Sequence, residues 1–523
     1  MMNAEKFLSR DELIADIRYL ANMIETVHPD PYINQGGKIA FHRRLHELIL
    51  KLPSTGMSVR KFYRYLLPFV AAIKDAHTFL YPLYKDQKAG IPFKFDVVDN
   101  CLYISGVYFD MHRHLIGSKL LAIEDVDLSS LLERQTTLRG CENPYGVLVS
   151  LTYCLQNYHE LINLLPEIEH KQRVRINVEL PSGVMKEVEV EILPHITYDT
   201  MLMAPTRVNL PQLVDFSDIG YGFIDKHKRI AILRIDGMIF YRENLTSCKQ
   251  WMDFVLPKIA KSYEKKFKRP APKNKEELIA IVPWVTDIFK NFFTEMKAAK
   301  TDTLIIDVRK NTGGNSLLAD ILMYFLYGKE AIFVPSMIVK YSKLYFDTYK
   351  EQKLSEINKN RPFELTETDY DFVDFKEFKG YCNKAVDKRS QLVDVAYFGK
   401  IYKSGKYSGY YCPKNVFVLT SARTASSGYY LMASLYKKGA ILVGVPSCQS
   451  GNGFGETLSF ILPNSKIRVG VSSMVFLFFP DDTEKGKILR PHYELTYDKL
   501  KTYEFDPNSE LRLALELIGQ TSE

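Results

Sequence analysis

Four short apolar runs separated by helix-like sequence constrain the fold of this chain most strongly. RIAILRID (229–236), TLIIDV (303–308), VFVLTS (416–421) and AILVGV (440–445) are rich in Ile, Leu and Val. Runs without polar alternation are typical of parallel strands that are covered by helices on both faces. Because strands and helices alternate here, the sequence predicts an α/β core with a mainly parallel, layered sheet.

Two regions with different patterns of apolar residues precede this core. Apolar residues repeat at helical spacing from Leu13 to Ile24 and again over 41–52 and 59–73, which predicts an N-terminal helical domain over residues 1–85. Residues 86–215 contain short β-like runs such as FKFDVV and VRINVEL, and we expect a small β-rich domain with a helical insert there. The core then takes 216–523, with insertions near 243–300 and 334–412.

Composition and charge exclude several classes of protein. The net charge of +7 is small for 523 residues, and its local excess lies in one Lys- and Arg-rich run, which is typical of a solvated helix end and not of a nucleic-acid surface. The seven cysteines form no C-x-x-C pair or metal-ligand spacing; they are Cys101, Cys141, Cys154, Cys248, Cys382, Cys412 and Cys448. The sequence predicts no metal or cofactor site.

The chain as given has no export or membrane signal. Its start, MMNAEKFLSRDELIADI, lacks an apolar stretch of ~7–15 residues, and no later segment approaches ~20 apolar residues. Together with the scattered cysteines, this predicts a cytoplasmic protein with reduced thiols.

Two turns between a strand and a helix have residues suited to catalysis. Gly313-Gly314 follows the strand at 303–308, and such a turn leaves backbone N–H groups available to an oxyanion. Small residues from Ser421 to Gly428 follow the strand at 416–421, and a serine at a helix N-terminus has its alkoxide favoured by the helix dipole. Each turn alone is also an ordinary turn or N-cap.

Taken together, the motifs resemble the family of C-terminal-processing (tail-specific) and tricorn-core serine peptidases. DVRKNTGG (307–314) is similar to its D-L-R-x-N-x-G-G signature, and TASS (424–427) to its nucleophile motif. GVPS, LPNSKIRVGVS and the segment from Glu484 to Pro491 are similar to later family motifs. His28-Pro29-x-Pro31-Tyr32 and DAHT (75–78) resemble its N-terminal elements, so the resemblance covers nearly the full chain.

This resemblance implies a fold and part of an active site. It implies a crotonase-like ββα peptidase core and a PDZ-like fold for the β-rich domain, whose HLIGSKLLAIEDVDLSSLLE stretch is similar to a strand and helix of a PDZ domain. Ser426 is then the nucleophile. The oxyanion hole comes from the N–H of Ser427 and from Gly313 or Gly314.

The family uses two different general bases, and the residues present choose between them. The tail-specific branch has a lysine where this chain has Ser450, so the resemblance favours the tricorn-like branch with His77 as base. The family's terminal glutamate corresponds to Glu484, which completes a Ser426, His77 and Glu484 triad, with Asp481 and Asp482 as competitors. Tricorn-like enzymes have a serine before the histidine, where this chain has Ala76.

The predicted function is therefore a serine peptidase that acts on peptides or unfolded proteins, as an endopeptidase or at carboxy termini; an oligomer stays possible. A non-catalytic ligand- or peptide-binding protein on the same fold is the alternative, and scaffolding is a third. The sequence has no G-x-S-x-G or H-E-x-x-H motif. Gly451-Asn452-Gly453-Phe454-Gly455 lacks the lysine of a phosphate loop, and we expect a flexible loop there beside the active site.

Overall fold

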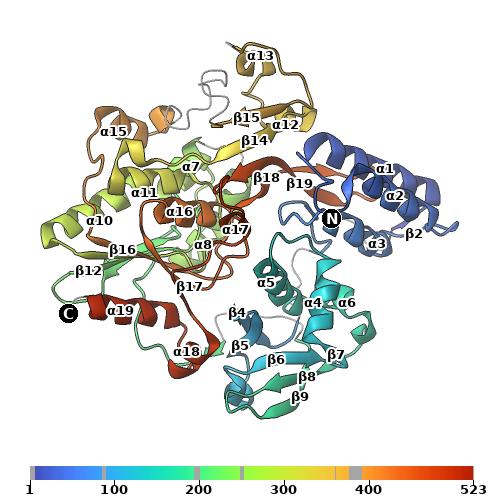
Figure 1. Cartoon of the computed structure of the whole chain (residues 1–523), viewed down its shortest axis with the longest axis horizontal. Coiled ribbons are helices and arrows are strands. Elements are labelled where there is room, and N and C mark those ends of the chain that lie inside the picture. The colour runs from blue at the N-terminus through green and yellow to red at the C-terminus, as the bar shows by residue number, and fades with distance from the viewer. Residues whose placement is uncertain are drawn as a thin grey trace.

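The computed structural model describes residues 6–84, 90–193, 201–247, 252–359, 361–375 and 392–521. It has a mixed α/β, multi-domain architecture with helices and several sheets (Figure 1). The predicted domain boundary at 85/86, Cys248, Cys382 and parts of both predicted insertions lie outside the described residues.

The central sheet has six strands. In spatial order they are β11 (Ile219–Phe223), β12 (Ile230–Ile235), β13 (Thr303–Asp307), β16 (Asn415–Thr420), β17 (Ile441–Gly444) and β20 (Tyr493–Glu494). β11 is antiparallel to β12, and every other neighbouring pair is parallel. All four apolar runs are strands of this sheet, so the predicted mainly parallel core is confirmed.

Alternate residues of the central strands are buried in two different clusters. In β13, Leu304 and Ile306 join the cluster formed with α10 (Val285–Ala299), α11 (Leu317–Tyr327) and α16 (Ser427–Tyr436). Ile305 joins the cluster on the other face, which includes α19 (Ser509–Thr521) and the β-rich domain. Because side chains alternate across a strand, this pattern places a layer on each face of the sheet.

A second, antiparallel sheet corrects two expectations. Its order is β15 (Tyr370–Val373), β14 (Ser336–Lys340), β19 (Arg468–Leu477) and β18 (Asn452–Ile461), and β3 (Phe79–Leu80) also pairs with β19. The predicted insertion at 334–412 therefore supplies two strands of this sheet. The segment Gly451–Gly455 is not a flexible loop, because residues 452–455 pair with residues 474–477 of β19 and begin β18.

The N-terminal helices pack against this second sheet. They are α1 (Arg10–Val27), α2 (Gly37–Leu50) and α3 (Val59–Ala71), as predicted, and one cluster joins them to β14, β18 and β19. A capping box between Ser9 and Glu12 starts α1. Lys340 Nζ donates to the carbonyl oxygens of Glu25 (2.6 Å) and His28 (3.0 Å), so a lysine of β14 satisfies the C-terminal end of α1.

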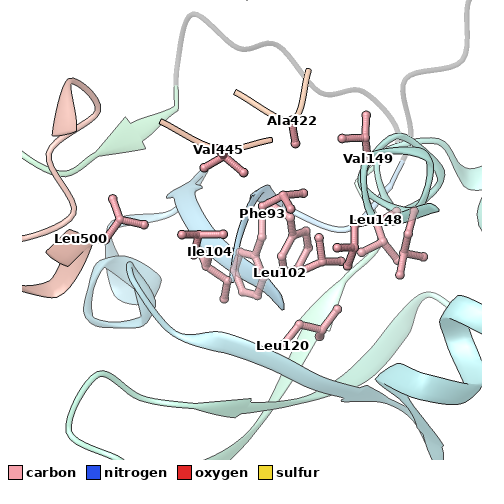
Figure 2. Close-up of a cluster of buried hydrophobic side chains, with 14 of the residues drawn as sticks. Phe93, Leu102, Ile104, Leu120, Leu148, Val149, Ala422, Val445 and Leu500 are labelled. Atoms are coloured by element: carbon pink, nitrogen blue, oxygen red, sulfur yellow. The ribbon is translucent and has the colours of Figure 1, made fainter. Parts of the chain in front are cut away.

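The β-rich domain lies against the other side of the central sheet. Its main strands are β4 (Phe93–Val98), β5 (Cys101–Val107), β6 (Lys119–Ile123), β8 (Arg173–Glu179) and β9 (Met185–Glu191), and its helices are α4 (Leu128–Thr136), α5 (Pro144–Leu155) and α6 (Tyr158–Leu164). Figure 2 shows Phe93, Leu102 and Val149 of this domain in one apolar cluster with Ala422 and Val445 of the core. The two domains therefore share a core.

The remaining helices and strands are short or peripheral. They are β1 (Phe7–Leu8), β2 (Met57–Ser58), β7 (Val126–Asp127), β10 (Leu202–Met203), α7 (Arg242–Ser247), α8 (Met252–Phe267), α9 (Lys275–Ile281), α12 (Lys343–Thr348), α13 (Leu354–Ile357), α15 (Phe398–Ser404), α17 (Thr483–Lys487) and α18 (Tyr497–Thr502). Within the described ranges, no helix has the length and apolar character needed to cross a membrane.

Candidate active site

Ser426 lies directly before α16 in a strained conformation, with φ 52° and ψ −124°. A positive φ is uncommon for a serine, and such strain persists where the surrounding structure holds it, often at functional sites. Here the Ala425 N–H donates to the Asn311 carbonyl oxygen (3.0 Å), and Thr424 Oγ1 donates to the Val308 carbonyl oxygen (2.9 Å). The T-A-S-S turn is thus bonded to the turn that follows β13.

Gly313 packs directly against Ser426. Its φ is 112°, and a Cβ built on it would lie 2.6 Å from Ser426 Cβ, so both the backbone and the contact require glycine. The D-V-R-K-N-T-G-G and T-A-S-S turns follow the carboxyl ends of the adjacent parallel strands β13 and β16. This edge of a parallel sheet is where open α/β folds place their sites.

Two of the three predicted oxyanion groups are available. The Gly313 N–H already donates to Asn311 Oδ1 (2.9 Å). Within the described residues, the N–H groups of Gly314 and Ser427 have no acceptor at hydrogen-bonding distance. The Ser427 hydroxyl donates to the Gly314 carbonyl oxygen (2.8 Å) and is buried, which leaves Ser426 as the serine of this pair with its side chain free to react.

His77 lies in the tight turn between α3 and β3, and buried Asp75 shapes that turn. Asp75 accepts from the His77 N–H (2.8 Å), Thr78 Oγ1 (2.5 Å) and Ser472 Oγ (2.6 Å), and lies 3.2 Å from His28 Nε2. His28 comes from the predicted H-P-x-P-Y element, so the two N-terminal motifs meet. Pairing of β3 with β19 then fixes the turn to the second sheet.

The imidazole of His77 is partly enclosed. Its side chain is 22% exposed, and its Nδ1 is buried, 3.9 Å from Asp75 Oδ1 and without a hydrogen-bond partner in the described structure. Burial lowers the pKa of His77, which outweighs the opposing charge of Asp75. The ring is therefore neutral near pH 7, as a general base must be.

Glu142 is the acidic residue that the structure adds to this site. One ligand-type atom each of Asp75, His77 and Glu142 lie within 4.8 Å of one another. Glu142 Oε2 accepts from the Ser450 N–H (3.0 Å), while Oε1 is buried and has no partner among the described residues. Burial raises the pKa of Glu142 to about 8, and the charge of Asp75 adds to the effect.

The sequence reasoning missed Glu142 because no motif marks it. It lies between α4 and α5 of the β-rich domain, in the peptide C-E-N-P. The one local signal is Asn143, which caps α5 and positions the preceding residue. A second signal is distant: Gly453 of β18 has no side chain, and a Cβ there would lie 2.7 Å from Glu142 Oε2.

The structure does not bring Glu484 to His77. Glu484 lies in α17, its side chain is 84% exposed, and it pairs with Lys487 at 3.4 Å. Asp482 caps the same helix and pairs with Lys485, and Asp481 is exposed. Glu484 therefore lies on a short polar surface helix and not beside His77. The acidic residues beside the base are Asp75 and Glu142.

Ser450, at the position of the family's lysine, and the preceding Gln449 connect the Ser426 turn to Glu142. Gln449 Oε1 accepts from the Ser426 N–H (3.2 Å), and the adjacent Ser450 N–H donates to Glu142. No hydrogen bond joins Ser426 Oγ to His77 in the described structure. Catalytic hydrogen bonds often form only with substrate bound, so this geometry leaves His77 a candidate base.

These features define a class of protein. A strained serine at a helix N-terminus, two free backbone N–H groups and a neutral histidine beside carboxylates are the parts of a serine hydrolase. The model of peptidase family S41 matches residues 278–486, which include Ser426 and the Gly313-Gly314 turn. Residues 278–486 are thus similar to peptidase family S41, and the protein is a serine-type peptidase.

Two solved structures of CPAF have a fold similar to that of this chain. Mature CPAF complexed with lactacystin is 14% identical, with 97% of this chain and 99% of that chain covered and a TM-score of 0.57. Mature CPAF alone is 13% identical, with 94% of each chain covered and a TM-score of 0.55. The photosystem II D1 C-terminal processing protease is 11% identical over 93% of this chain and 94% of its own, at a TM-score of 0.40. None of the curated protein sequences matches this chain.

Proposed function

We propose that this peptidase cleaves peptide bonds through an acyl-enzyme on Ser426, with His77 as the general base. The observation that carries this proposal is the strained Ser426, held against Gly313 at the N-terminus of α16. Because Nδ1 of His77 lies toward the carboxylates, Nε2 is the nitrogen left to take the Ser426 proton.

In this mechanism each group has one task. Ser426 Oγ bonds to the scissile carbonyl carbon as its proton passes to His77, and the N–H groups of Gly314 and Ser427 stabilise the resulting oxyanion. The C–N bond then breaks, and His77 returns the proton to the leaving amine. A water molecule, deprotonated by His77, then attacks the ester carbonyl carbon, and His77 returns that proton to Ser426 Oγ as the C–O bond breaks. The ionised Asp75 stabilises the imidazolium that forms twice in this cycle.

A fluorophosphonate probe tests the proposal directly. We expect stoichiometric labelling of the wild-type chain at Ser426, no labelling of Ser426→Ala and strongly reduced labelling of His77→Ala, since both change the reacting groups. Ser427→Ala is the matched control, because its hydroxyl is bonded to Gly314, and it should keep most of the labelling. Undiminished labelling in Ser426→Ala would contradict the mechanism. Unlabelled but folded wild-type protein would favour the alternative of a non-catalytic binding protein.

The substrate class follows from the family and is supported by a cavity beside the base. A cavity of about 510 Å³ is lined by Ala76 and Thr78, which flank His77, and by apolar residues of α3 and α5. A space of this size accepts an apolar side chain of a peptide. We propose a peptide or unfolded protein as substrate, and a cleavage profile on a peptide library distinguishes internal from carboxy-terminal cleavage.

The finer fold and the compartment also belong to this proposal. The seven-stranded sheet built around β4, β5, β6, β8 and β9, with α5 packed on β4, supports a PDZ-like fold for the β-rich domain. The layered central sheet supports a crotonase-like core. The described cysteines carry free thiols, which supports a cytoplasmic location. Fractionation of cells that express the tagged chain tests the location.

A further inference from the structure

The cluster of Asp75, His77 and Glu142 gathers the donor atoms of a divalent-cation site. Each residue offers one ligand atom, and the three atoms lie within 4.8 Å of one another. The 3.9 Å between His77 Nδ1 and Asp75 Oδ1 is too long for a hydrogen bond. Two ligands of a tetrahedral zinc ion lie roughly 3.4 Å apart, so these side chains would move slightly closer together around an ion.

Two buried atoms at this cluster lack the partners that buried polar atoms normally have. His77 Nδ1 and Glu142 Oε1 are both buried, and within the described residues neither has a hydrogen-bond partner. The other Glu142 oxygen is taken by the Ser450 N–H, so Oε1 is the one left to bind a ligand. Asp75 Oδ1 accepts one hydrogen bond, from the His77 N–H, and retains a second lone pair.

The charge at the cluster also favours a cation. Asp75 lies 3.2 Å from His28 Nε2 and 3.9 Å from His77 Nδ1, and Glu142 adds a second carboxyl group. A divalent ion would compensate the charge of two carboxylates in this enclosed position. The Nη2 of Arg139 donates to the Ala76 carbonyl oxygen, and in the described part of the chain Arg139 forms no ion pair with these carboxylates.

We infer that Asp75 Oδ1, His77 Nδ1 and Glu142 Oε1 form an inhibitory zinc site. The inference rests on the proposed role of His77 as base. Zinc suits this mixed nitrogen and oxygen donor set, whereas Ca²⁺ and Mg²⁺ prefer oxygen ligands alone. A metal on Nδ1 replaces the proton there and leaves the remaining N–H on Nε2. That nitrogen then cannot accept the Ser426 proton, so zinc and catalysis exclude each other.

Zinc binding is tested first, independently of activity. Full-length Ser426→Ala protein is titrated with Zn²⁺ against a chromophoric chelator, and we expect one saturable site. Adding Glu142→Gln, which keeps the shape of the side chain, or His77→Ala should weaken binding about tenfold or more, since each removes a ligand. Glu167→Gln is the control, because Glu167 pairs with Arg134 on the surface. No binding, or equal binding in all variants, overturns the site.

Inhibition is tested second, on protein with an intact Ser426. Zn²⁺ should suppress fluorophosphonate labelling, EDTA should restore it, and equal concentrations of Ca²⁺ or Mg²⁺ should leave it unchanged. In Glu142→Gln the zinc concentration for half-suppression should rise about tenfold or more, in parallel with the loss of binding. Binding at the cluster without suppression overturns the inhibitory role. Absence of labelling in metal-free protein contradicts the peptidase mechanism and leaves the binding result to decide the site.

Discussion

At the scale of single residues, Gly313 determines whether Ser426 can keep its position. Gly313→Ala would place a Cβ 2.6 Å from Ser426 Cβ, so the serine or the glycine turn must shift. A displacement of about 1 Å in a catalytic group lowers rates about 10²-fold. We therefore expect fluorophosphonate labelling of Gly313→Ala to slow by about that factor, measured by single-turnover kinetics, with the fold retained by circular dichroism.

Gly183→Ala is the matched control for Gly313→Ala. Gly183 also has a positive φ (88°), but nothing lies within 4 Å of the position of its Cβ. Both variants have the cost of about 1–2 kcal/mol for a left-handed non-glycine residue, and only Gly313→Ala has the contact with Ser426. Equal labelling rates in the two variants would show that this contact does not position the nucleophile.

The sequence could predict the residues of local motifs and not those brought in from a distance. Ser426, Ser427, Gly313 and Gly314 lie in turns whose residue types reveal the turn, and the structure places them together. Glu142 could not be predicted as a site residue, because its environment depends on a glycine in β18 and on the N–H of Ser450, both more than 300 residues away. The structure does not place Glu484 beside His77 as predicted, because a motif match carries no information about whether a side chain is exposed.

At the scale of elements, Arg309 fastens α19 to the end of β13. Its guanidinium bonds both oxygens of Asp307 (2.9 and 2.8 Å), Glu510 Oε2 (2.7 Å) and Asn508 Oδ1 (3.0 Å). Arg309→Gln leaves the buried Asp307 and the partly buried Glu510 without this cation, which costs about 3–5 kcal/mol. We expect this loss in the free energy of unfolding by urea at pH 7. Arg173→Gln, which breaks an exposed cluster, should cost less than about 1 kcal/mol.

The pH dependence of the Arg309→Gln effect has a definite sign. Burial alone would raise the pKa of Asp307, but Arg309 holds it below its ordinary value in the folded protein. The pair therefore stabilises the fold above the ordinary pKa of an aspartate, and this contribution is lost as pH falls through the depressed value. The difference in unfolding free energy between wild type and Arg309→Gln should shrink below pH 4. A difference that is constant from pH 7 to pH 3 would contradict the assignment.

Elements with a clear periodicity were predictable, and those shaped by long-range pairing were not. The strands at 229–236 and 303–308 are buried on both faces, so their composition alone identifies them. Residues 452–455 are rich in glycine and look like a loop, yet they form a strand because β19 supplies the partner hydrogen bonds. For the same reason the sequence did not reveal that β14 and β15, within the predicted insertion, are strands of the second sheet.

At the scale of the whole molecule, the candidate site is assembled from all three regions of the chain. The N-terminal region supplies His77 and Asp75, the β-rich domain supplies Glu142, and the core supplies Ser426 and the oxyanion groups. In Figure 1 the helices α1 to α3, the domain of α4 to α6 and the core of α16 lie around a common centre. A change that loosens the contact between two of these regions should therefore reduce activity without touching a reacting group.

Arg423 offers that test. It lies three residues before Ser426 and reaches into the β-rich domain, where it bonds Asp96 (3.3 Å), the Phe95 carbonyl oxygen (3.0 Å) and Thr152 Oγ1 (3.0 Å). Arg423→Gln removes this ion pair and the two bonds to the β-rich domain, while Asp96, whose side chain is 26% exposed, keeps Lys94 at 2.6 Å. We expect labelling at Ser426 to slow about tenfold or more, and hydrogen exchange to increase in β4 and α5 while α11 stays protected.

The control for Arg423→Gln changes an arginine within the β-rich domain. Arg134 pairs with Glu167 at 2.8 Å, and both side chains are about 40% exposed, at 42% and 41%. Arg134→Gln should therefore leave both the labelling rate and the exchange of β4 and α5 unchanged, because exposed pairs contribute little. If Arg423→Gln behaves like this control, the β-rich domain does not position the catalytic groups. If exchange increases while labelling is unchanged, Glu142 is dispensable for the base, because the domain that supplies it has loosened without effect on Ser426.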